Sequence, residues 1–278
     1  MRIMLAFFVV LLWSPNALPA GTAARDEATA VVVDVTDGNT AMLDRPVMGS
    51  QVLRLAGIEA PHIAEEDERW PLAEDARRTL AELALGHPVQ LSFEGLPLDR
   101  YRRLVAHADR ESGSGEAQSR ETRVWLQGEM LARGMARVRS LPDNRSRAAT
   151  MLVAERDARS DRRGIWAHPF YRIRTPDEAE ADIDSFQIVE GIVLDRARVR
   201  DRVYLNFGAD WRTDFTVSIE TRLLPAFEEA ALDPMALKGR KIRVRGWIES
   251  RNGPLIEATH PEQIEILPDA VPGASPGS

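Results

Sequence analysis

The feature that most constrains the fold is a series of short β-type runs interrupted once by a helical stretch. Apolar residues alternate with polar ones in these runs, and turn-forming residues separate them. The expected strands cover residues 30–35, 40–43, 51–56, 89–93 and 104–108. Between the third and fourth runs, Leu72, Ala76, Leu80 and Leu83 recur at helical spacing, after Pro71 and before Gly86. The first part of the chain is therefore predicted to be mainly β, with a single helix inside the strand series.

Two further helices are expected after these strands. One runs from about Thr122 to Gly134, and the other from about Asn144 to Gly164. The full order is β-β-β-α-β-β-α-α. Five strands with one helix between the third and fourth is the order of the OB fold, a small Greek-key barrel with a binding groove on one face. This domain is expected to span residues 29–170, with a polar loop at 112–119.

A second set of strands follows an acidic stretch. Residues 171–185 contain five acidic side chains between 177 and 184, and they are expected to form a linker or a short exposed helix. Strand-like runs cover residues 186–195, 202–207, 214–219, 242–249 and 255–267, with a helix at 223–231. The order β-β-β-α-β-β recurs, so a second OB-like β-barrel is predicted at 186–267. The tail at 268–278 has the composition of disordered chain.

The N-terminus resembles an export signal. Arg2 supplies one positive charge before an apolar run at residues 4–13, about half of the ~20 residues that a membrane span needs. Residues 1–20 are therefore predicted to be a signal peptide cleaved after Ala20, which leaves no membrane anchor. An uncleaved anchor is the alternative. The expected location is secreted or periplasmic.

Composition limits the function classes. The chain has no cysteine, which excludes disulfides, thiolate zinc sites and a lipid anchor on cysteine. The formal net charge of −7 argues against a protein that coats nucleic acid by overall charge. Any polyanion must therefore be held by a local group of basic residues.

Four short motifs in the first expected domain carry a resemblance to a known family. They are Asp37-Gly38-Asn39-Thr40, Arg54-Leu55-Ala56-Gly57-Ile58-Glu59-Ala60-Pro61-His62, Asp99-Arg100-Tyr101-Arg102-Arg103 and Gly164-Ile165-Trp166. In this order and at comparable spacing, they resemble the thermonuclease family, also called staphylococcal nuclease-like. The resemblance implies a staphylococcal-nuclease-type OB-fold barrel and phosphodiester hydrolysis of nucleic acid.

The resemblance assigns phosphate contacts to two arginines. Arg54 and Arg103 match the two catalytic arginines of the family, and a guanidinium fits the geometry of a phosphate while staying charged at any working pH. The alternative for Arg54 is a salt bridge on an edge strand. Arg102 stands where the family has glycine, so its side chain is expected either to crowd the site or to add a phosphate contact.

The metal and base positions depart from the family pattern. Asn39 and Glu59 match positions of calcium ligands, but Asn39 brings no charge and Glu59 is longer than the usual aspartate. His62 stands where the family has the glutamate that orients or deprotonates the attacking water, and histidine can serve as a base or as a ligand for zinc. The predicted divalent metal is weakly held calcium or another cation, and a site without metal is the alternative.

Two functions follow from these residues. The first is an exported, divergent, metal-dependent phosphodiesterase, a nuclease that acts on DNA or RNA. The second is a catalytically degenerate module that binds nucleic acid or an envelope protein partner. The resemblance also implies base-stacking tyrosines within residues 137–141. This chain has no aromatic residue there, and Arg137 and Arg139 are expected to contact a phosphate backbone instead.

The second expected barrel has a possible nucleic-acid surface of its own. Alternate positions carry Arg196, Arg198, Arg200 and Arg202. In an extended chain these arginines would project from one side, and with Trp211 and Trp247 they could hold single-stranded nucleic acid. In the alternative, the arginines flank a hairpin tip with Asp195 and Asp201 as partners, and both tryptophans lie in the core.

Overall fold

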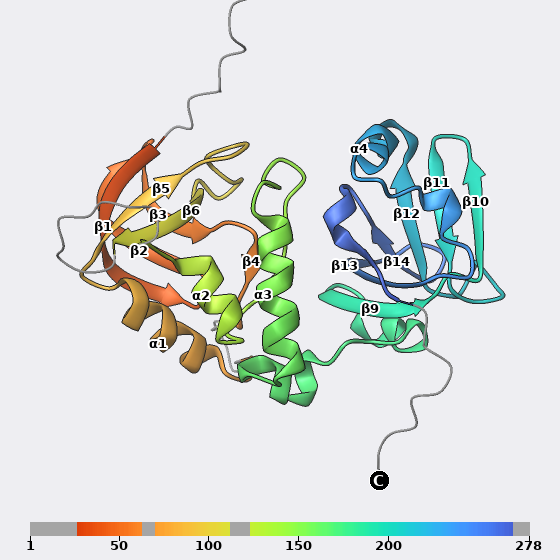
Figure 1. The fold of residues 1–278 in the computed structure, drawn as a ribbon, viewed down its shortest axis with the longest axis horizontal. Helices are drawn as coiled ribbons and strands as arrows, with labels where there is room; N and C mark the ends of the chain where they lie inside the picture. Colours follow the sequence, from red (N-terminus) through yellow and green to blue (C-terminus); the bar gives the residue numbers. More distant parts are fainter. Residues whose placement is uncertain (1–26, 63–69, 112–122, 269–278) are drawn as a thin grey trace, which may run out of the picture.

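The computed structural model describes residues 27–62, 70–111 and 123–268, which form two lobes side by side (Figure 1). Each lobe has its own hydrophobic cluster, the first drawn from residues 30–151 and the second from residues 179–264. The predicted signal peptide, the polar loop and all but the first residue of the predicted tail lie outside the described residues. Among the helices that are described, none is long and apolar enough to cross a membrane.

The first lobe is built on a closed five-stranded barrel, as its strand order predicted. Its strands are β1 (Glu27–Asp37), β2 (Thr40–Val47), β3 (Ser50–Leu55), β5 (Pro88–Ser92) and β6 (Leu104–Glu111). Neighbouring strands pair antiparallel in the order β3-β2-β1-β5-β6, and a parallel pairing of β3 with β6 closes the barrel. The helix α1 (Ala73–Ala84) buries Ala76, Leu80 and Leu83, the positions that the helical spacing selected.

The two trailing helices are present but shorter than predicted. The segment expected to open the first of them instead forms a short strand, β7 (Arg123–Trp125), which pairs with β6, and α2 covers only Leu126–Ala132. The last helix, α3, covers Ala148–Ser160. Before it, the Oδ1 of Asn144 accepts a hydrogen bond from Nε2 of buried His107 at 2.9 Å. Both segments that precede the helices are thus engaged in tertiary contacts.

Gly164 fixes the point where the chain leaves α3. Its φ is +51°, a left-handed conformation that glycine adopts most easily. A Cβ at this position would lie 2.2 Å from the carbonyl oxygen of Gly134, the same oxygen that accepts a hydrogen bond from the Ile165 amide at 2.8 Å. The end of α2 and the chain after α3 thus touch backbone to backbone, and the Gly-Ile-Trp motif marks this contact.

Replacing Gly164 with alanine should lower the free energy of unfolding by about 3 kcal/mol, because it adds both backbone strain and a clash that backbone atoms must relieve. Gly86→Ala is the matched control: φ there is +77°, but no atom lies within 4 Å of the added Cβ. Strain alone should cost about 1 kcal/mol in the control. Urea unfolding measures both, and equal losses would contradict the proposed clash.

The predicted second β-barrel is wrong, because the second lobe contains a seven-stranded sheet that is not closed. Its strands are β9 (Phe186–Ile192), β10 (Asp195–Val199), β11 (Arg202–Asn206), β12 (Thr216–Glu220), β13 (Lys241–Ser250), β14 (Pro254–Glu257) and β15 (Ile264–Ile266). The order is β10-β11-β12-β14-β13-β15, and β9 pairs with β13. The strand predicted at 186–195 divides at Val193 and Leu194 into β9 and β10. Strand β9 pairs with β13, whereas β10 pairs with β11 at the other end of the sheet. The short helix α4 (Leu224–Glu229) lies between β12 and β13 in the chain.

The acidic stretch packs against the second lobe. It contains the 3-10 helix η4 (Pro176–Asp182), whose Ala179 is fully buried in the second hydrophobic cluster. Asp182 pairs with Arg174 at 2.6 Å, and the backbone of Arg174 bonds to the strand β9. Buried contacts and an ion pair therefore hold this segment against β9.

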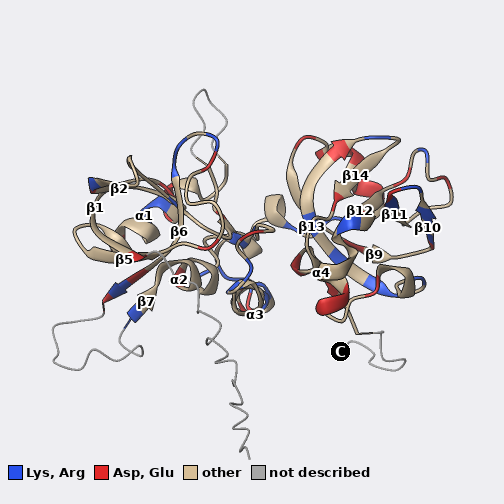
Figure 2. Ribbon diagram, turned by 90° about the horizontal axis from the view of Figure 1, so that it is seen from above, with Lys and Arg blue, Asp and Glu red and all other residues tan. Residues whose placement is uncertain are grey.

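Helix α3 and strand β8 (Arg137–Val138) of the first lobe face β9 and β13 of the second, and both ribbon views place α3 between the lobes (Figures 1 and 2). Arg245 of β13 donates to Glu155 of α3 at 2.8 Å and to the Val138 carbonyl at 3.2 Å. Arg137 donates to the Phe186 carbonyl at 2.7 Å. Two further contacts cross the interface: Ser140 with His260 and Arg145 with Glu262. The interface is therefore held by buried, directed polar contacts.

Candidate anion-binding site

A cavity of about 660 Å³ lies where the end of β3, the turn at 99–103 and the chain after β8 come together. Its walls include the arginines Arg54, Arg103 and Arg139, together with His62, Tyr101 and Trp247. The two arginines that the motifs selected therefore share one cavity with Arg100 and Arg139. We call this the arginine cavity. Because Trp247 belongs to β13, the second lobe contributes to its wall.

Arg54 lines the arginine cavity from β3, a strand with a neighbour on each side. Strand β3 pairs with β2 on one side and β6 on the other, so the edge-strand alternative for this arginine is wrong. Within the described part of the chain Arg54 forms no ion pair, and its shortest side-chain hydrogen bond is a long one, 3.5 Å from Nη1 to Asn39 Oδ1. Burial, and then the positive charges of Arg103 and Arg139, lower the pKa of Arg54. Among the described residues, the charge of Arg54 is therefore poorly compensated, and a bound anion would supply the missing partner.

A tight turn presents Arg103. The Asp99 carboxylate accepts hydrogen bonds from the backbone amides of Tyr101 and Arg103, both at 2.9 Å, and from the Arg103 Nε at 2.8 Å. Burial by itself would raise the pKa of Asp99, but these bonds and the Arg103 charge lower it overall. Arg102 has a φ of +61°, which explains why glycine suits its position, and its own side chain is exposed. The aspartate of this motif therefore holds the turn that orients the arginine.

Glu59 is occupied by cationic side chains. It lies in the short strand β4 (Ile58–Glu59), which pairs with β8, and its side chain is 3% exposed. One carboxylate oxygen accepts from Arg137 Nε at 3.1 Å and Nη2 at 2.9 Å, and the other accepts from Arg139 Nη1 at 2.9 Å. His62 Nε2 lies 3.9 Å from the second oxygen. Burial would raise the pKa of Glu59, but the nearby His62 and the charges of Arg137 and Arg139 outweigh it and lower the pKa to about 2.

Asn39 is likewise engaged in structural contacts. It is fully buried, its Nδ2 donates to the Ile58 carbonyl at 3.3 Å, and its Oδ1 accepts from the Thr40 hydroxyl at 3.2 Å. Its backbone amide donates to Asp37 at 2.8 Å. Asn39 therefore has the expected turn-forming role, and its amide oxygen, the atom expected to bind a metal, already accepts a hydrogen bond.

The residues present do not fit a calcium ion. Calcium needs six or more oxygen ligands, usually including several free carboxylates. At the positions assigned to the metal, Asn39 and Glu59 offer one amide and one carboxylate that two guanidinium groups already neutralise. Across residues 27–62, 70–111 and 123–268, no group of three or more histidine, aspartate or glutamate side chains could hold a metal.

Residues 52–168, which contain most of the first lobe, match a known protein family. The model of the staphylococcal nuclease homologue family matches residues 52–168. Residues 52–168 are therefore a staphylococcal nuclease family domain, and the resemblance seen in the motifs is confirmed over this range. The family is typically calcium-dependent and acts on nucleic acid. No curated protein matches the sequence.

Sequence reasoning missed part of the cavity wall. Arg139 was expected only as a backbone contact, and Trp247 was assigned either to a surface on its own lobe or to the core. The core alternative is wrong, since Trp247 is 46% exposed and Trp211 is 52% exposed. The signal for Trp247 was the alternation along β13, where Ile242, Val244 and Ile248 fill the core and the intervening residues do not.

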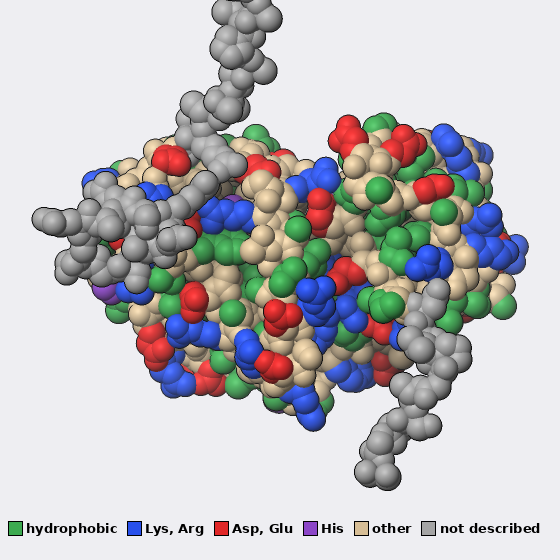
Figure 3. Space-filling view, in the orientation of Figure 1, with side chains coloured by type: hydrophobic (Ala, Val, Ile, Leu, Met, Phe, Trp, Pro, Cys, Tyr) green, Lys and Arg blue, Asp and Glu red, His purple; other side chains and the backbone are tan. Residues whose placement is uncertain are grey.

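The row of arginines in the second lobe does not form one surface. The chain reverses at Arg200, whose φ is +54°, so Arg196 and Arg198 lie on β10 and Arg202 lies on β11. Arg196 donates to the Met235 carbonyl, while Arg202 pairs with Glu220 and Glu257. Basic and acidic side chains are interspersed over the face seen in Figure 3. This face therefore offers no broad basic surface that could hold a polyanion.

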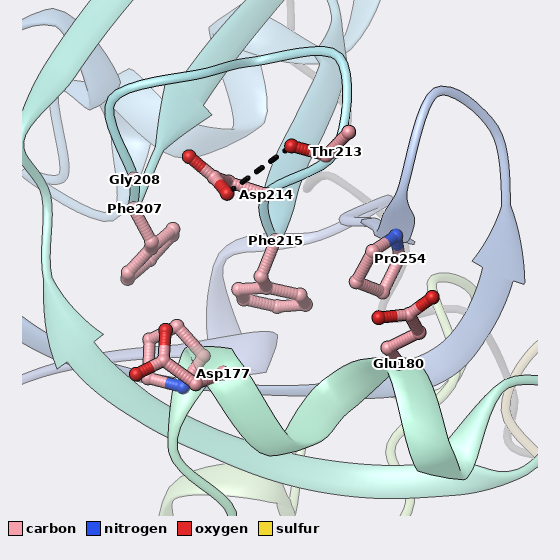
Figure 4. A pocket seen from close by; sticks show the side chains of 9 residues that line it. Asp177, Glu180, Phe207, Gly208, Thr213, Asp214, Phe215 and Pro254 are labelled. Carbon is pink, nitrogen blue, oxygen red and sulfur yellow. Dashed lines mark hydrogen bonds between the residues drawn. The ribbon is translucent and has the colours of Figure 1, made fainter.

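A smaller cavity of about 270 Å³ in the second lobe has the opposite charge. Figure 4 shows Asp177 and Glu180 approaching it from the helix η4 and Asp214 from the facing loop, with the rings of Phe207 and Phe215 between them. Three carboxylates would repel a phosphate. The arginine cavity is thus the better candidate of the two for an anionic ligand.

Proposed function

We propose that this protein binds nucleic acid, DNA or RNA, through the arginine cavity and holds it without cutting it. The single observation that carries the proposal is the charge of Arg54 beside Arg103 and Arg139, which no described residue neutralises in an ion pair. A phosphodiester would supply the missing negative charge, and guanidinium groups match its oxygens in a bidentate geometry. The staphylococcal nuclease family domain supports nucleic acid as the source of that phosphodiester.

The contacts of Glu59 favour binding over hydrolysis. A metal-dependent nuclease needs a carboxylate free to hold the cation that activates water. For Glu59 to take that role, it would first have to leave Arg137 and Arg139, and Arg137 would then be left buried without its carboxylate partner. Removing one member of a buried ion pair costs about 3–5 kcal/mol.

Hydrolysis is the second candidate function, favoured by one observation. His62 lines the same cavity as Arg54 and Arg103, so an imidazole able to act as a base stands near the proposed phosphate position. The divergent nuclease would then rely on residues other than the calcium-type ligands of its family. We further propose export to the periplasm or the medium, on the basis of the N-terminal apolar run; the mass of the mature chain tests the cleavage after Ala20.

Replacing Arg54 and Arg103 together with alanine should weaken the binding of a short fluorescent single-stranded oligonucleotide at low salt by at least about tenfold, because two charge-assisted contacts are lost. The slope of log K against log salt should also become shallower by about 1.4, since each phosphate contact contributes about 0.7 on single strands. Fluorescence anisotropy over a salt series measures both quantities.

The matched control replaces Arg198 and Arg200 with alanine. Both side chains are exposed and lie in the hairpin of the second lobe, so this variant removes the same charge without touching the cavity. Equal losses in the two variants would show that only net charge matters and would contradict a site. If wild-type protein binds no oligonucleotide at low salt, nucleic-acid binding is wrong and an envelope protein becomes the candidate partner.

Cutting is tested separately, with plasmid and single-stranded DNA in calcium, magnesium, manganese or zinc. We expect no cleavage above that of the Arg54→Ala, Arg103→Ala variant. Cleavage by the wild type that disappears in this variant and in His62→Ala would establish the nuclease and overturn binding without hydrolysis.

A further inference from the structure

We infer that the second lobe completes the ligand site: Trp247 is a stacking surface for an unpaired base of the strand whose phosphates the arginine cavity holds. The ligand class is therefore single-stranded nucleic acid, and duplex is disfavoured. This inference rests on the function proposed above, and it assigns to the second lobe a role in the binding site of the first.

The direction of Trp247 follows from the alternation along β13. Residues Ile242, Val244 and Ile248 are buried in the core of the second lobe. Successive side chains in a strand point to opposite faces, so Arg245 and Trp247 share the face that points away from that core. Arg245 on this face reaches Glu155 and the Val138 carbonyl of the first lobe. Trp247, two residues further along, is directed toward the first lobe as well, where it lines the arginine cavity.

Buried contacts hold the tryptophan in place relative to the arginines. Arg245 and Glu155 are both 1% exposed at their side chains, and Arg137 joins β8 to the start of β9 through the Phe186 carbonyl. Phe186 is the register partner of Trp247 in the pairing of β9 with β13. Arg139, a cavity residue, has its guanidinium 5.4 Å from the Phe186 ring. The interface therefore fixes the position of Trp247 beside Arg139, with no freely moving linker between them.

Exposure makes Trp247 available to a ligand. Trp247 is 46% exposed although it is a large apolar residue, whereas the ring of Tyr101 in the same cavity already has the guanidinium groups of Arg100 and Arg103 against it, 4.7 and 5.2 Å from its centroid. Guanidinium groups with exposed aromatic rings are the combination that binds single strands, where the arginines follow the backbone and the bases stack on the rings. A base inside a duplex is already stacked on both faces, so it is not available to a protein ring without unpairing.

The test compares three fluorescent probes by anisotropy at low salt: a short oligothymidylate, an abasic strand of the same length and a duplex. Wild-type protein should bind oligothymidylate about tenfold more tightly than the abasic strand, the size expected for stacking of one base. In Trp247→Ala this ratio should fall toward one, and Trp247→Phe should keep most of it because a ring remains.

Trp211→Ala is the matched control, since Trp211 is an equally exposed tryptophan of the same lobe that lines a different cavity. It should keep the wild-type ratio, and thermal unfolding of all variants verifies that they fold. The inference would be overturned if Trp247→Ala kept the wild-type ratio, if Trp211→Ala lost it, or if the duplex bound more tightly than the single strand. None of these outcomes decides the proposed function, which the variant lacking both Arg54 and Arg103 tests. If the wild type binds none of the probes, the proposed function and the inference both fail.

Discussion

Replacing Arg245 with methionine is expected to lower the free energy of unfolding by about 3–5 kcal/mol, the cost of breaking a buried ion pair by removing one partner. Arg245 is 1% exposed and bonds to both Glu155 and Glu265. Without it, Glu155 keeps its hydrogen bond from the Val138 amide but has lost the partner that best compensates its buried charge. Urea unfolding at neutral pH measures the loss.

Two further variants separate the buried pair from a general effect of losing an arginine. Arg251→Met removes an exposed arginine of the same lobe whose partner Glu249 is also exposed, and should cost less than about 1 kcal/mol. Adding Glu155→Gln to Arg245→Met should recover part of the loss, because a neutral amide can still accept from Val138 and leaves no buried charge. If Arg245→Met costs no more than Arg251→Met, the interface is not held by this pair.

Replacing Glu59 with glutamine should destabilise the protein by about 3 kcal/mol at neutral pH, and the difference from wild type should shrink in acid. The pKa of Glu59 is lowered from 4.5 to about 2 in the folded protein. Its carboxylate therefore stabilises the fold fully above about pH 4.5, and this contribution is lost as the pH falls through about 2. In the variant, Arg137 remains buried with an uncharged partner at every pH.

Urea unfolding of wild type and Glu59→Gln between pH 7 and pH 3 follows this difference. Glu249→Gln, on an exposed ion pair, is the control and should track the wild type. If Glu59→Gln is as stable as the wild type but no longer binds calcium in calorimetry, the structural role is wrong and Glu59 is a metal ligand. A loss of stability that stays constant with pH would show that the carboxylate charge is not responsible.

The calcium-type assignment shows where sequence reasoning reached its limit. The motif positions of Asn39 and Glu59 were recognisable, but the partners that occupy Glu59 come from Arg137 and Arg139. Arg137 lies 78 residues away in the chain, brought opposite Glu59 by the pairing of β4 with β8. Each of these strands has only two residues, which is too short for a periodic pattern in the sequence to predict their pairing.

The meeting of Arg54 and Arg103, by contrast, was predictable. The ordered motifs placed both on one barrel, and the parallel pairing of β3 with β6 sets Arg54 opposite Val105, two residues after Arg103. The class of the first lobe over residues 52–168 was readable from the same motifs. For the second lobe, five strands were predicted and seven are present, because the strands expected at 186–195 and 255–267 each divide in two. The prediction that its sheet closes into a barrel was wrong.

The sequence by itself therefore determined the barrel of the first lobe, because strand alternation, helix spacing and turn residues are local and act over a few neighbours. Its motifs also selected Arg54 and Arg103, which line one cavity. Only the tertiary structure decided that Glu59 is neutralised and that Trp247 reaches the cavity of the other lobe. Both depend on which distant side chains share a buried volume. The packing of whole strands and lobes decides which side chains are buried together, and a buried charge is stable only with a partner of opposite charge.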